Sequence, residues 1–363
     1  MKAAIWGATG AAGIEFVRAL VNHPWFEITA VYASDKSAGK TLEEACVVEI
    51  SDVPMQLRKM IVRRIDEVTD IDFLCSALPS EIAREYEGKY AAHYPIISTT
   101  SAFRYEKDVP ILITEVNSTH DILLEAQKKR GWKGWIAPGP NCTTVGLVMS
   151  LYPLLELGIK RVTMSSYQSV SGGGYSLLKK WEEQHAATLP LPEIHQEPLD
   201  QPPLTLEGNV LGYIKKEEEK VKTETRKILG RLSGYNVYPV SFALECSCVR
   251  VPTLQGHFET VFVDMEKKCT VDNVKELYER FNATSAEKFS QLPSSPRKTI
   301  TVLDRAPQPR FDSFADGGMS TIIGRIEKTE QGIKYQVLSN NTVKGAAKGM
   351  IQVAEYLMTR GWL

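Results

Sequence analysis

The chain has few cysteines, and none of them are spaced as a pair of metal ligands. Its 363 residues include six cysteines, and no two of them form the C-x-x-C spacing of zinc sites and redox dithiols. A disulfide framework and a metal site are therefore not expected. Few, unpaired cysteines are typical of reduced thiols in the cytoplasm.

Long apolar runs and an excess of charge of one sign are also missing. No apolar stretch approaches the roughly 18 to 20 residues that cross a bilayer. Glycines interrupt the apolar opening of the chain, where a signal peptide needs a continuous core. The formal net charge of −1 gives no general basic surface for nucleic acid or an anionic membrane. We expect a soluble, cytoplasmic protein whose ligands are small molecules.

The composition is that of an ordinary globular protein. Hydrophobic residues make up 43% of the chain and charged residues 24%, and the length predicts about two domains. Short apolar strands separated by helical patterns begin with 2–6 and 26–33, which is typical of a Rossmann-type, doubly wound parallel sheet in an α/β fold. Longer β-rich runs at 161–170, 241–251 and 257–265 predict a mixed sheet in a second, α+β domain.

The change in pattern places a domain boundary near residue 140. We expect residues 1–140, with a C-terminal helix in 341–363, to form a nucleotide-binding domain, and 141–340 to form a catalytic and dimerisation domain. The five prolines of 189–203 predict an irregular surface segment.

A glycine-rich turn stands between the first predicted strand and the first predicted helix. It reads Gly7-Ala8-Thr9-Gly10-Ala11-Ala12-Gly13. Backbone N–H groups and the helix dipole at such a turn can hold the pyrophosphate of a dinucleotide. The alternative is a tight turn that needs glycine for packing alone.

The residues after the second predicted strand indicate which dinucleotide binds. About twenty residues beyond the glycines, where an NAD enzyme places an acid on the ribose hydroxyls, the chain reads Ser34-Asp35-Lys36-Ser37. Ser34, Lys36 and Ser37 could bond a 2′-phosphate if Asp35 points away. NADP is therefore the predicted cofactor.

Cys142 follows Pro140 and Asn141 and precedes a helical pattern that starts near residue 145. The sequence therefore predicts that its sulfur lies at a helix N-terminus, where thiolate is favoured. The dipole contributes about 0.3–1 kcal/mol, which is less than one pKa unit. A nearby cation or base must therefore help to form the Cys142 thiolate.

Arg250 and His257 flank a short Pro/Gly turn between two of the β-rich runs, which predicts a hairpin. If Val251 pairs with Gly256, the side chains of Arg250 and His257 lie on one face of the hairpin, and if Val251 pairs with His257 they do not. A lone histidine in a hairpin is more often structural. Among the six histidines, however, His257 is the one in the β-rich half with a cation nearby, so it is the candidate base.

In this order the motifs resemble the aspartate-semialdehyde dehydrogenases, in the branch found in archaea and fungi. The resemblance covers nearly the full length and is weakest across 176–207. Its markers include the opening Gly-Ala-Thr-Gly turn and the segments 33–40, 101–104, 140–144, 167–172, 248–252 and 341–343. It implies an NADP-dependent phosphorylating oxidoreductase of lysine, threonine and methionine biosynthesis that interconverts L-aspartate 4-semialdehyde and L-4-aspartyl phosphate. It also implies a homodimer or homotetramer.

The resemblance also implies roles for individual residues. Cys142 resembles the nucleophile, His257 the general acid/base and Gln168 the residue that orients the acyl group. Arg250 is similar to the arginine that binds the substrate carboxylate, and Glu218 to the acid near its amino group. The other implied contacts are Arg104 and Lys220 to phosphate, Asn141 to substrate, and Ser171, Gly172 and Asn341 to cofactor.

Other functions remain open at this stage. A related archaeal branch reduces malonyl-CoA on the same scaffold, although Asn141 and the pair Thr143-Thr144 look more like the semialdehyde enzymes. A cysteine hydrolase using Cys142 and His257 leaves the glycine-rich turn unexplained. A dinucleotide-binding regulator without catalysis would have no use for the cationic side chains that are expected to bind carboxylate and phosphate.

Overall fold

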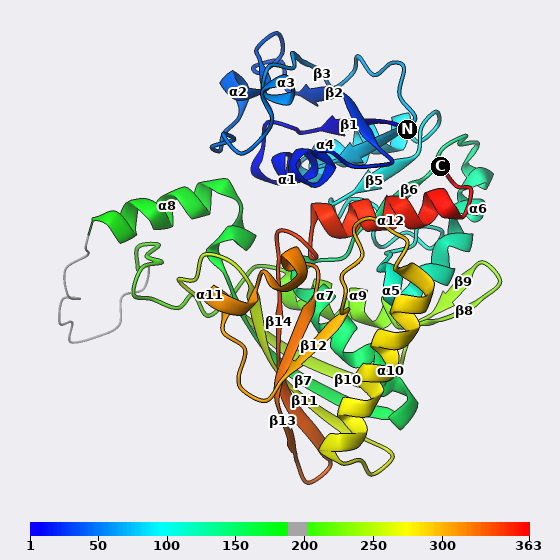
Figure 1. Ribbon diagram of the computed structural model, residues 1–363, viewed down its shortest axis with the longest axis vertical. Coiled ribbons are helices and arrows are strands. Elements are labelled where there is room, and N and C mark those ends of the chain that lie inside the picture. The colour runs from blue at the N-terminus through cyan, green and yellow to red at the C-terminus, as the bar shows by residue number, and fades with distance from the viewer. Residues whose placement is uncertain (188–201) are drawn as a thin grey trace.

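Two six-stranded sheets organise the chain, as the computed structural model shows for residues 1–187 and 202–363 (Figure 1). The proline-rich segment predicted at 189–203 lies almost wholly outside these described residues. One sheet is built from the N-terminal part of the chain and the other from residues beyond 158. Both expected sheets are therefore confirmed.

The first sheet is parallel throughout and has the order β3-β2-β1-β4-β5-β6. This order reverses between β1 and β4, which is the point where doubly wound sheets bind nucleotides. Every residue of β4 is buried, as expected for a strand covered on both faces. The strands are β1 (Lys2–Trp6), β2 (Glu27–Ala33), β3 (Val62–Arg64), β4 (Phe73–Ser76), β5 (Ile96–Ser98) and β6 (Ile136–Pro138).

Helices from both ends of the chain cover this sheet. The helix α12 (Ala347–Thr359) lies beside α1 (Figure 1), and its apolar face shares a core with Ile14 and Val17 of that helix. A buried ion pair, Lys344 to Glu115 at 2.7 Å, stands close to the start of α12. The other helices of this part are α1 (Ala11–Leu20), α2 (Leu42–Ala45), α3 (Met55–Arg58), α4 (Ser80–Tyr90), α5 (Thr114–Asn117) and α6 (Leu123–Gln127).

The second sheet is mixed and has the order β10-β7-β11-β14-β13-β12. The hairpin predicted between β10 and β11 is wrong, because β7 lies between them, parallel to β10 and antiparallel to β11. The connecting residues therefore cross over the end of β7 instead of closing a turn. The strands are β7 (Ile159–Gln168), β10 (Ala243–Arg250), β11 (His257–Met265), β12 (Ile300–Leu303), β13 (Thr321–Lys328) and β14 (Gly332–Ser339).

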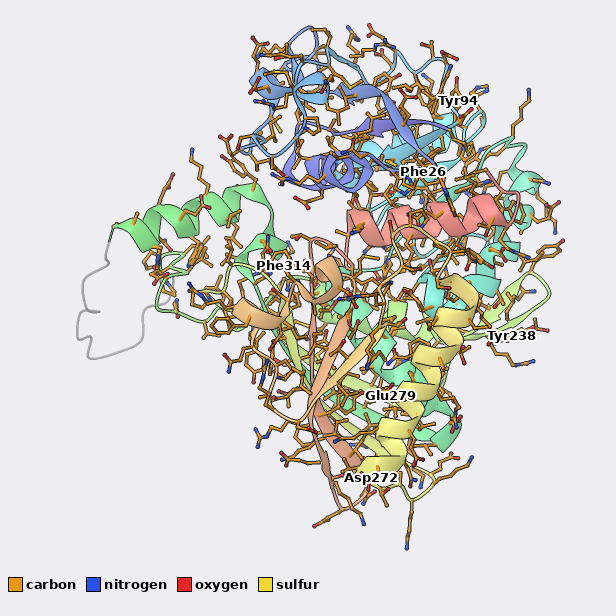
Figure 2. The ribbon with its side chains drawn as sticks, in the orientation of Figure 1. Phe26, Tyr94, Tyr238, Asp272, Glu279 and Phe314 are labelled. Carbon is orange, nitrogen blue, oxygen red and sulfur yellow. The ribbon has the colours of Figure 1, made fainter. Side chains whose placement is uncertain are left out.

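Three helices cover one face of the mixed sheet: α7 (Cys142–Leu151), α9 (Glu217–Ile228) and α10 (Val271–Phe289). Asp272 and Glu279, labelled in Figure 2, are exposed on α10, while its Leu277 joins the core. The remaining α-helices and strands are α8 (Tyr175–Ala186), α11 (Pro309–Asp312) and the small sheet of β8 (Arg231–Ser233) and β9 (Asn236–Tyr238).

The opposite face of the mixed sheet carries outward-pointing side chains. Tyr167 of β7 and Phe262 of β11 are 39% and 44% exposed. Because side chains alternate along a strand, their neighbours Gln168 and Val261 point to the covered face and are buried. Within the described part of the chain, none of the helices has the length and apolar character needed to span a bilayer.

Candidate active site

Cys142 is the first residue of α7, so the prediction of a helix-start cysteine is confirmed. Asn141 caps the helix, and its Oδ1 accepts from the backbone N–H of Thr143 at 2.9 Å and of Thr144 at 3.3 Å. Asparagine and aspartate are preferred at N-cap positions because their side chains accept hydrogen bonds from these otherwise unpaired donors. The cap therefore fixes where the helix begins and where the sulfur lies.

Three candidate residues lie side by side at the ends of neighbouring strands. Gln168 pairs with Arg250 across β7 and β10. On the other side of β7, the Tyr167–Phe258 pair places His257 next to Gln168. All three side chains are buried on the face that α7 covers. Arg250 and His257 thus share a face because a third strand separates them, and not through either of the two hairpin registers.

The cysteine and the histidine are in direct contact, with Cys142 Sγ 3.2 Å from His257 Nε2. Gly172 closes the space beside them. A Cβ there would lie 2.6 Å from His257 Cε1 and 2.9 Å from Arg250 Nη1, which leaves room for no side chain. Gly345 approaches the other side, where a Cβ would lie 3.1 Å from Cys142 Cβ.

Burial keeps this pair neutral in the structure. Desolvation, with the charge of Glu217 acting in the same direction, raises the pKa of Cys142 to about 12. Desolvation also lowers the pKa of His257 to about 3, with the charge of Arg250 acting in the same direction. The expected thiolate-favouring effect of the helix start is therefore outweighed. Thiolate forms only if the thiol proton has an acceptor within the site.

The acid beside the nucleophile is Glu217, and not Glu218. Glu217 Oε1 accepts from Asn141 Nδ2 at 2.8 Å, and its Oε2 lies 3.3 Å from Lys220 Nζ. The Glu218 carboxylate instead accepts from the backbone N–H of Cys248 on the edge strand β10. The two residues diverge because successive residues of a helix point about 100° apart.

Arg104 reaches the same place from the first domain, where a second acid of α9 holds it. Its Nη1 lies 3.1 Å from Glu224 Oε1, and its Nη2 donates to the Thr99 carbonyl at 2.9 Å. Glu224 also accepts from the backbone N–H of Asn141. Neither of these buried acids was predicted from the sequence. The spacing 217, 220, 224 on one helical face is the signal that could have found them.

The glycine-rich turn fits a pyrophosphate. Gly7 has φ of 72°, and a Cβ on it would lie 2.7 Å from the Ala77 carbonyl oxygen. A Cβ on Gly13 would lie 2.0 Å from the Gly7 carbonyl oxygen. At the start of α1, Gly10 supplies no capping side chain and the first turn has no acid. The donors of this helix start can therefore face an anion. The turn also contains Ala8, Thr9 and Ala11.

Two other groups of predicted cofactor residues lie outside this turn, and the first is next to it, because the backbone N–H groups of Gly7 and Ala8 donate to the Tyr32 carbonyl of β2. Ser34, Lys36 and Ser37 directly follow β2, and Asp35 pairs with Arg64 of β3 at 3.5 Å. Sequence analysis missed that arginine. Ser171 and Asn341 lie beside the Cys142–His257 pair and are joined by a hydrogen bond of 2.9 Å.

The chain combines a doubly wound parallel sheet, which is typical of dinucleotide binding, with a cysteine and a histidine in contact. These features define a dinucleotide-dependent thiol enzyme. Comparison with known families narrows this class. Residues 2–123 match the model described as "Semialdehyde dehydrogenase, NAD binding domain", and residues 151–344 match "Semialdehyde dehydrogenase, dimerisation domain". The chain belongs to the aspartate-semialdehyde dehydrogenase family.

Individual relatives cover almost all of the chain. It is 40% identical to the aspartate-semialdehyde dehydrogenase of Archaeoglobus fulgidus, over 98% of this chain and 97% of that protein. It is 31% identical to the malonyl CoA reductase (NADP) of Metallosphaera sedula, over 100% and 98%. The crystal structure of the Candida albicans aspartate semialdehyde dehydrogenase with NADP superposes with a TM-score of 0.82 at 29% identity, over 100% and 99%.

Proposed function

We propose that this chain is an NADP-dependent, phosphorylating dehydrogenase that interconverts L-aspartate 4-semialdehyde and L-4-aspartyl phosphate. The observation that carries the proposal is the contact between Cys142 and His257, with Arg104 and Lys220 close to the same helix start. The names of the archaeal and fungal relatives support the substrate. The enzyme would serve lysine, threonine and methionine synthesis in the cytoplasm, and the free state of all six cysteines supports a reducing compartment.

His257 acts as the base that makes the nucleophile. It takes the proton of the Cys142 thiol, and the sulfur attacks the aldehyde carbon of the substrate. Protonated His257 then faces the oxygen on which negative charge develops. Arg250 binds the substrate α-carboxylate through its two-pronged guanidinium, and Gln168 orients the acyl carbon. Glu217, in place of Glu218, lies where it can accept from the substrate amino group, beside Asn141.

Bound NADP supplies the acceptor for the hydride that leaves the former aldehyde carbon. Loss of that hydride leaves the substrate as a thioester on Cys142. Arg104 and Lys220 hold phosphate, whose oxygen attacks the acyl carbon. The carbon–sulfur bond then breaks, 4-aspartyl phosphate leaves, and the sulfur is released as thiolate. In the biosynthetic direction the same steps run in reverse.

Three groups of residues would bind the cofactor. The turn of Gly7, Ala8, Thr9, Gly10, Ala11 and Gly13 would hold the pyrophosphate. Ser34, Lys36 and Ser37 would bond the 2′-phosphate, and Arg64 supports this because it neutralises Asp35. Ser171, Gly172 and Asn341 would lie at the nicotinamide end, close to Cys142. We assign 1–140 with 341–363 to cofactor binding and 141–340 to catalysis and dimerisation, which the packing of α12 on α1 supports.

The enzyme would assemble as a homodimer or homotetramer. The uncovered face of the mixed sheet supports this, because it exposes Tyr167 and Phe262 in the segment that matches the dimerisation model. Exposed aromatic side chains on a flat face are typical of protein interfaces.

The experiment that tests the activity follows reduced-nicotinamide absorbance with purified protein, NADP and aspartate semialdehyde. A phosphate-dependent rise that the Cys142→Ser variant lacks is the expected result. Absence of a rise, with and without phosphate, contradicts the proposal. Consumption of NADPH with malonyl-CoA, at a higher kcat/KM than with 4-aspartyl phosphate, would assign the chain to the other branch.

A further inference from the structure

One lysine of α9 is bound to main-chain carbonyl groups of the loop between β5 and α5. Lys227 Nζ lies 2.7 Å from each of the carbonyl oxygens of Arg104, Glu106 and Val109. Burial lowers the pKa of Lys227 to about 8, so at pH 7 the side chain is mainly an ammonium with three N–H donors. The three carbonyl groups use all of these donors. Lys227 therefore has no donor left for a ligand, and its contacts hold the loop instead.

Arg104 is attached to α9 through both its main chain and its side chain. Lys227 holds its carbonyl group, and Glu224, one helical turn earlier, accepts from its Nη1 at 3.1 Å. Glu224 also accepts a hydrogen bond from the backbone N–H of Asn141, which directly precedes the nucleophile. The helix α9 thus fixes where the arginine lies relative to the start of α7.

The other cation expected to bind phosphate needs no such attachment. Lys220 is itself a residue of α9, and its Nζ lies 3.3 Å from Glu217 Oε2 on the same helix. Arg104 comes instead from a loop of the parallel sheet, 120 residues earlier in the chain than Glu224. For the two cations to act on one phosphate, this loop must keep its place against α9.

The other contacts of the loop do not hold its main chain to α9. Arg84 and Arg130 form ion pairs with Glu106, but both arginines lie within the part of the chain that builds the parallel sheet. These pairs are partly exposed, and exposed ion pairs contribute little to stability. The Tyr105 hydroxyl makes a longer contact of 3.3 Å with the Glu224 carboxylate. Attachment of the loop's main chain to α9 therefore depends on the lysine.

We infer that Lys227 is a positioning residue for the phosphate step. By holding the main chain of the loop, it keeps Arg104 at the phosphate site. The inference rests on the proposed function in taking phosphate as the ligand of Arg104 and Lys220. Attack by Cys142 and hydride transfer do not involve Arg104, whereas attack by phosphate does. Loss of the Lys227 ammonium should therefore impair the second half of the reaction and spare the first.

Hydrogen exchange at pH 7, without cofactor or substrate, tests the attachment itself. Lys227→Met keeps most of the side-chain volume and removes the donors. Amides in the peptide that contains residues 104–109 should exchange about tenfold faster, or more, than in the unmodified protein, because the loop opens more easily. The matched control is Lys222→Met, in which α9 loses an ammonium that pairs with Glu245 on β10. In that variant the exchange of the loop should be unchanged.

Steady-state kinetics at pH 7 tests the consequence for the reaction. In Lys227→Met the KM for phosphate should rise by about tenfold or more, as when a hydrogen bond to a charged ligand is lost. The KM for aspartate semialdehyde should stay within about twofold. The burst of NADPH formed in one turnover without phosphate should keep its rate. Lys222→Met should change none of these quantities.

Chemical rescue separates the ammonium from a general effect on packing. n-Propylammonium has the carbon and nitrogen atoms that Lys227→Ala removes, so it should lower the raised KM for phosphate of that variant. n-Propanol, which has the same length and no charge, should not. If Lys227→Met does not fold, Lys227→Gln, which keeps two donors on a shorter side chain, replaces it and should show the same changes in smaller measure.

Unchanged exchange of the loop in the Lys227 variants overturns the inference, and so does an unchanged KM for phosphate. An equal rise in the KM for phosphate and for semialdehyde, or equal effects of n-propylammonium and n-propanol, would show a merely structural role and overturn it as well. Hydrogen exchange uses neither NADP nor substrate. A protein with the expected exchange but without phosphate-dependent activity would therefore disprove the proposed function and leave the attachment of Arg104 to α9 in place.

Discussion

Glu217 Oε1 lies 2.8 Å from Asn141 Nδ2. Because Asn141 directly precedes Cys142, this contact places a carboxylate close to the nucleophile. Its charge raises the pKa of the Cys142 thiol. The same charge suits the amino group of an amino-acid substrate. Glu217 therefore has two opposing effects, since it hinders ionisation of the sulfur and helps to bind the molecule that the sulfur attacks.

Glu217→Gln should separate these two effects. Loss of the charge lowers the pKa of Cys142, so alkylation by iodoacetamide at pH 7.5 should become faster. A hydrogen bond to a charged group is worth about 1.5–3 kcal/mol, so the KM for aspartate semialdehyde should rise by about tenfold or more. Glu218→Gln is the matched control and should leave both quantities within about twofold. If Glu218→Gln raises KM and Glu217→Gln does not, the original assignment of Glu218 is restored.

Gly172→Ala should nearly abolish activity. The added Cβ would meet His257 Cε1 at 2.6 Å and Arg250 Nη1 at 2.9 Å, and displacement of a catalytic group by about 1 Å can lower the rate about 10²-fold. We expect kcat/KM to fall about 100-fold. Gly88→Ala on α4, where the nearest atom to the new Cβ is 3.4 Å away, should remain active. Full activity of Gly172→Ala would show that the close approach is not needed.

Lys36→Ala should weaken the binding of NADP and leave the binding of NAD unchanged. Lys36 is exposed in the turn after β2, and we propose that its ammonium binds the 2′-phosphate, which NAD lacks. We expect the KM for NADP to rise by about tenfold, from the loss of a charge-assisted bond, with the KM for NAD unchanged. Lys89→Ala, at an exposed lysine of α4, controls for the loss of a surface charge. An equal rise for both dinucleotides would place Lys36 elsewhere on the cofactor.

Glu87→Gln should stabilise the protein in alkali. The carboxyl is buried and accepts hydrogen bonds from the hydroxyls of Ser98 and Thr100. Burial raises its pKa from 4.5 to about 7. The folded protein therefore holds this proton more tightly than the unfolded chain. The stability that this gives is fully present below pH 4.5 and is lost as the pH rises through 7.

The shift corresponds to about 3 kcal/mol. Denaturant unfolding at pH 5 and pH 8.5 should show that the advantage of Glu87→Gln over the unmodified protein is larger at pH 8.5 by about that amount. An advantage that does not change with pH would mean that Glu87 is ionised in the folded protein at both values.

Local patterns in the sequence predict local structure well and long-range pairing poorly. The first glycine turn and the helix start at Cys142 depend on residues within a few positions, and both are where the patterns place them. The hairpin expectation failed because β7, some 75 residues earlier in the chain than β10, lies between two strands that a short crossover loop connects. A linear sequence does not show such an insertion.

The position of Glu218 could not be predicted for a different reason. Three acids in succession begin α9, and only the rotation of that helix decides which of them faces the nucleophile. Ser169 lies within the marker segment 167–172, but neither charge nor spacing gave it a role of its own. Its position becomes informative only when Gly256 and Asn341, from distant segments, lie beside it.

The arrangement of α12 has a consequence for synthesis of the chain. Met350, Ile351 and Leu357, with other residues of α12, complete a core whose remaining members lie within the first 140 residues. During translation those earlier residues emerge first, and part of their apolar surface has no cover until the last helix leaves the ribosome. A nascent chain halted before residue 347 should therefore expose apolar surface on its nucleotide-binding sheet and depend on chaperones, even though all six strands of that sheet have already been made.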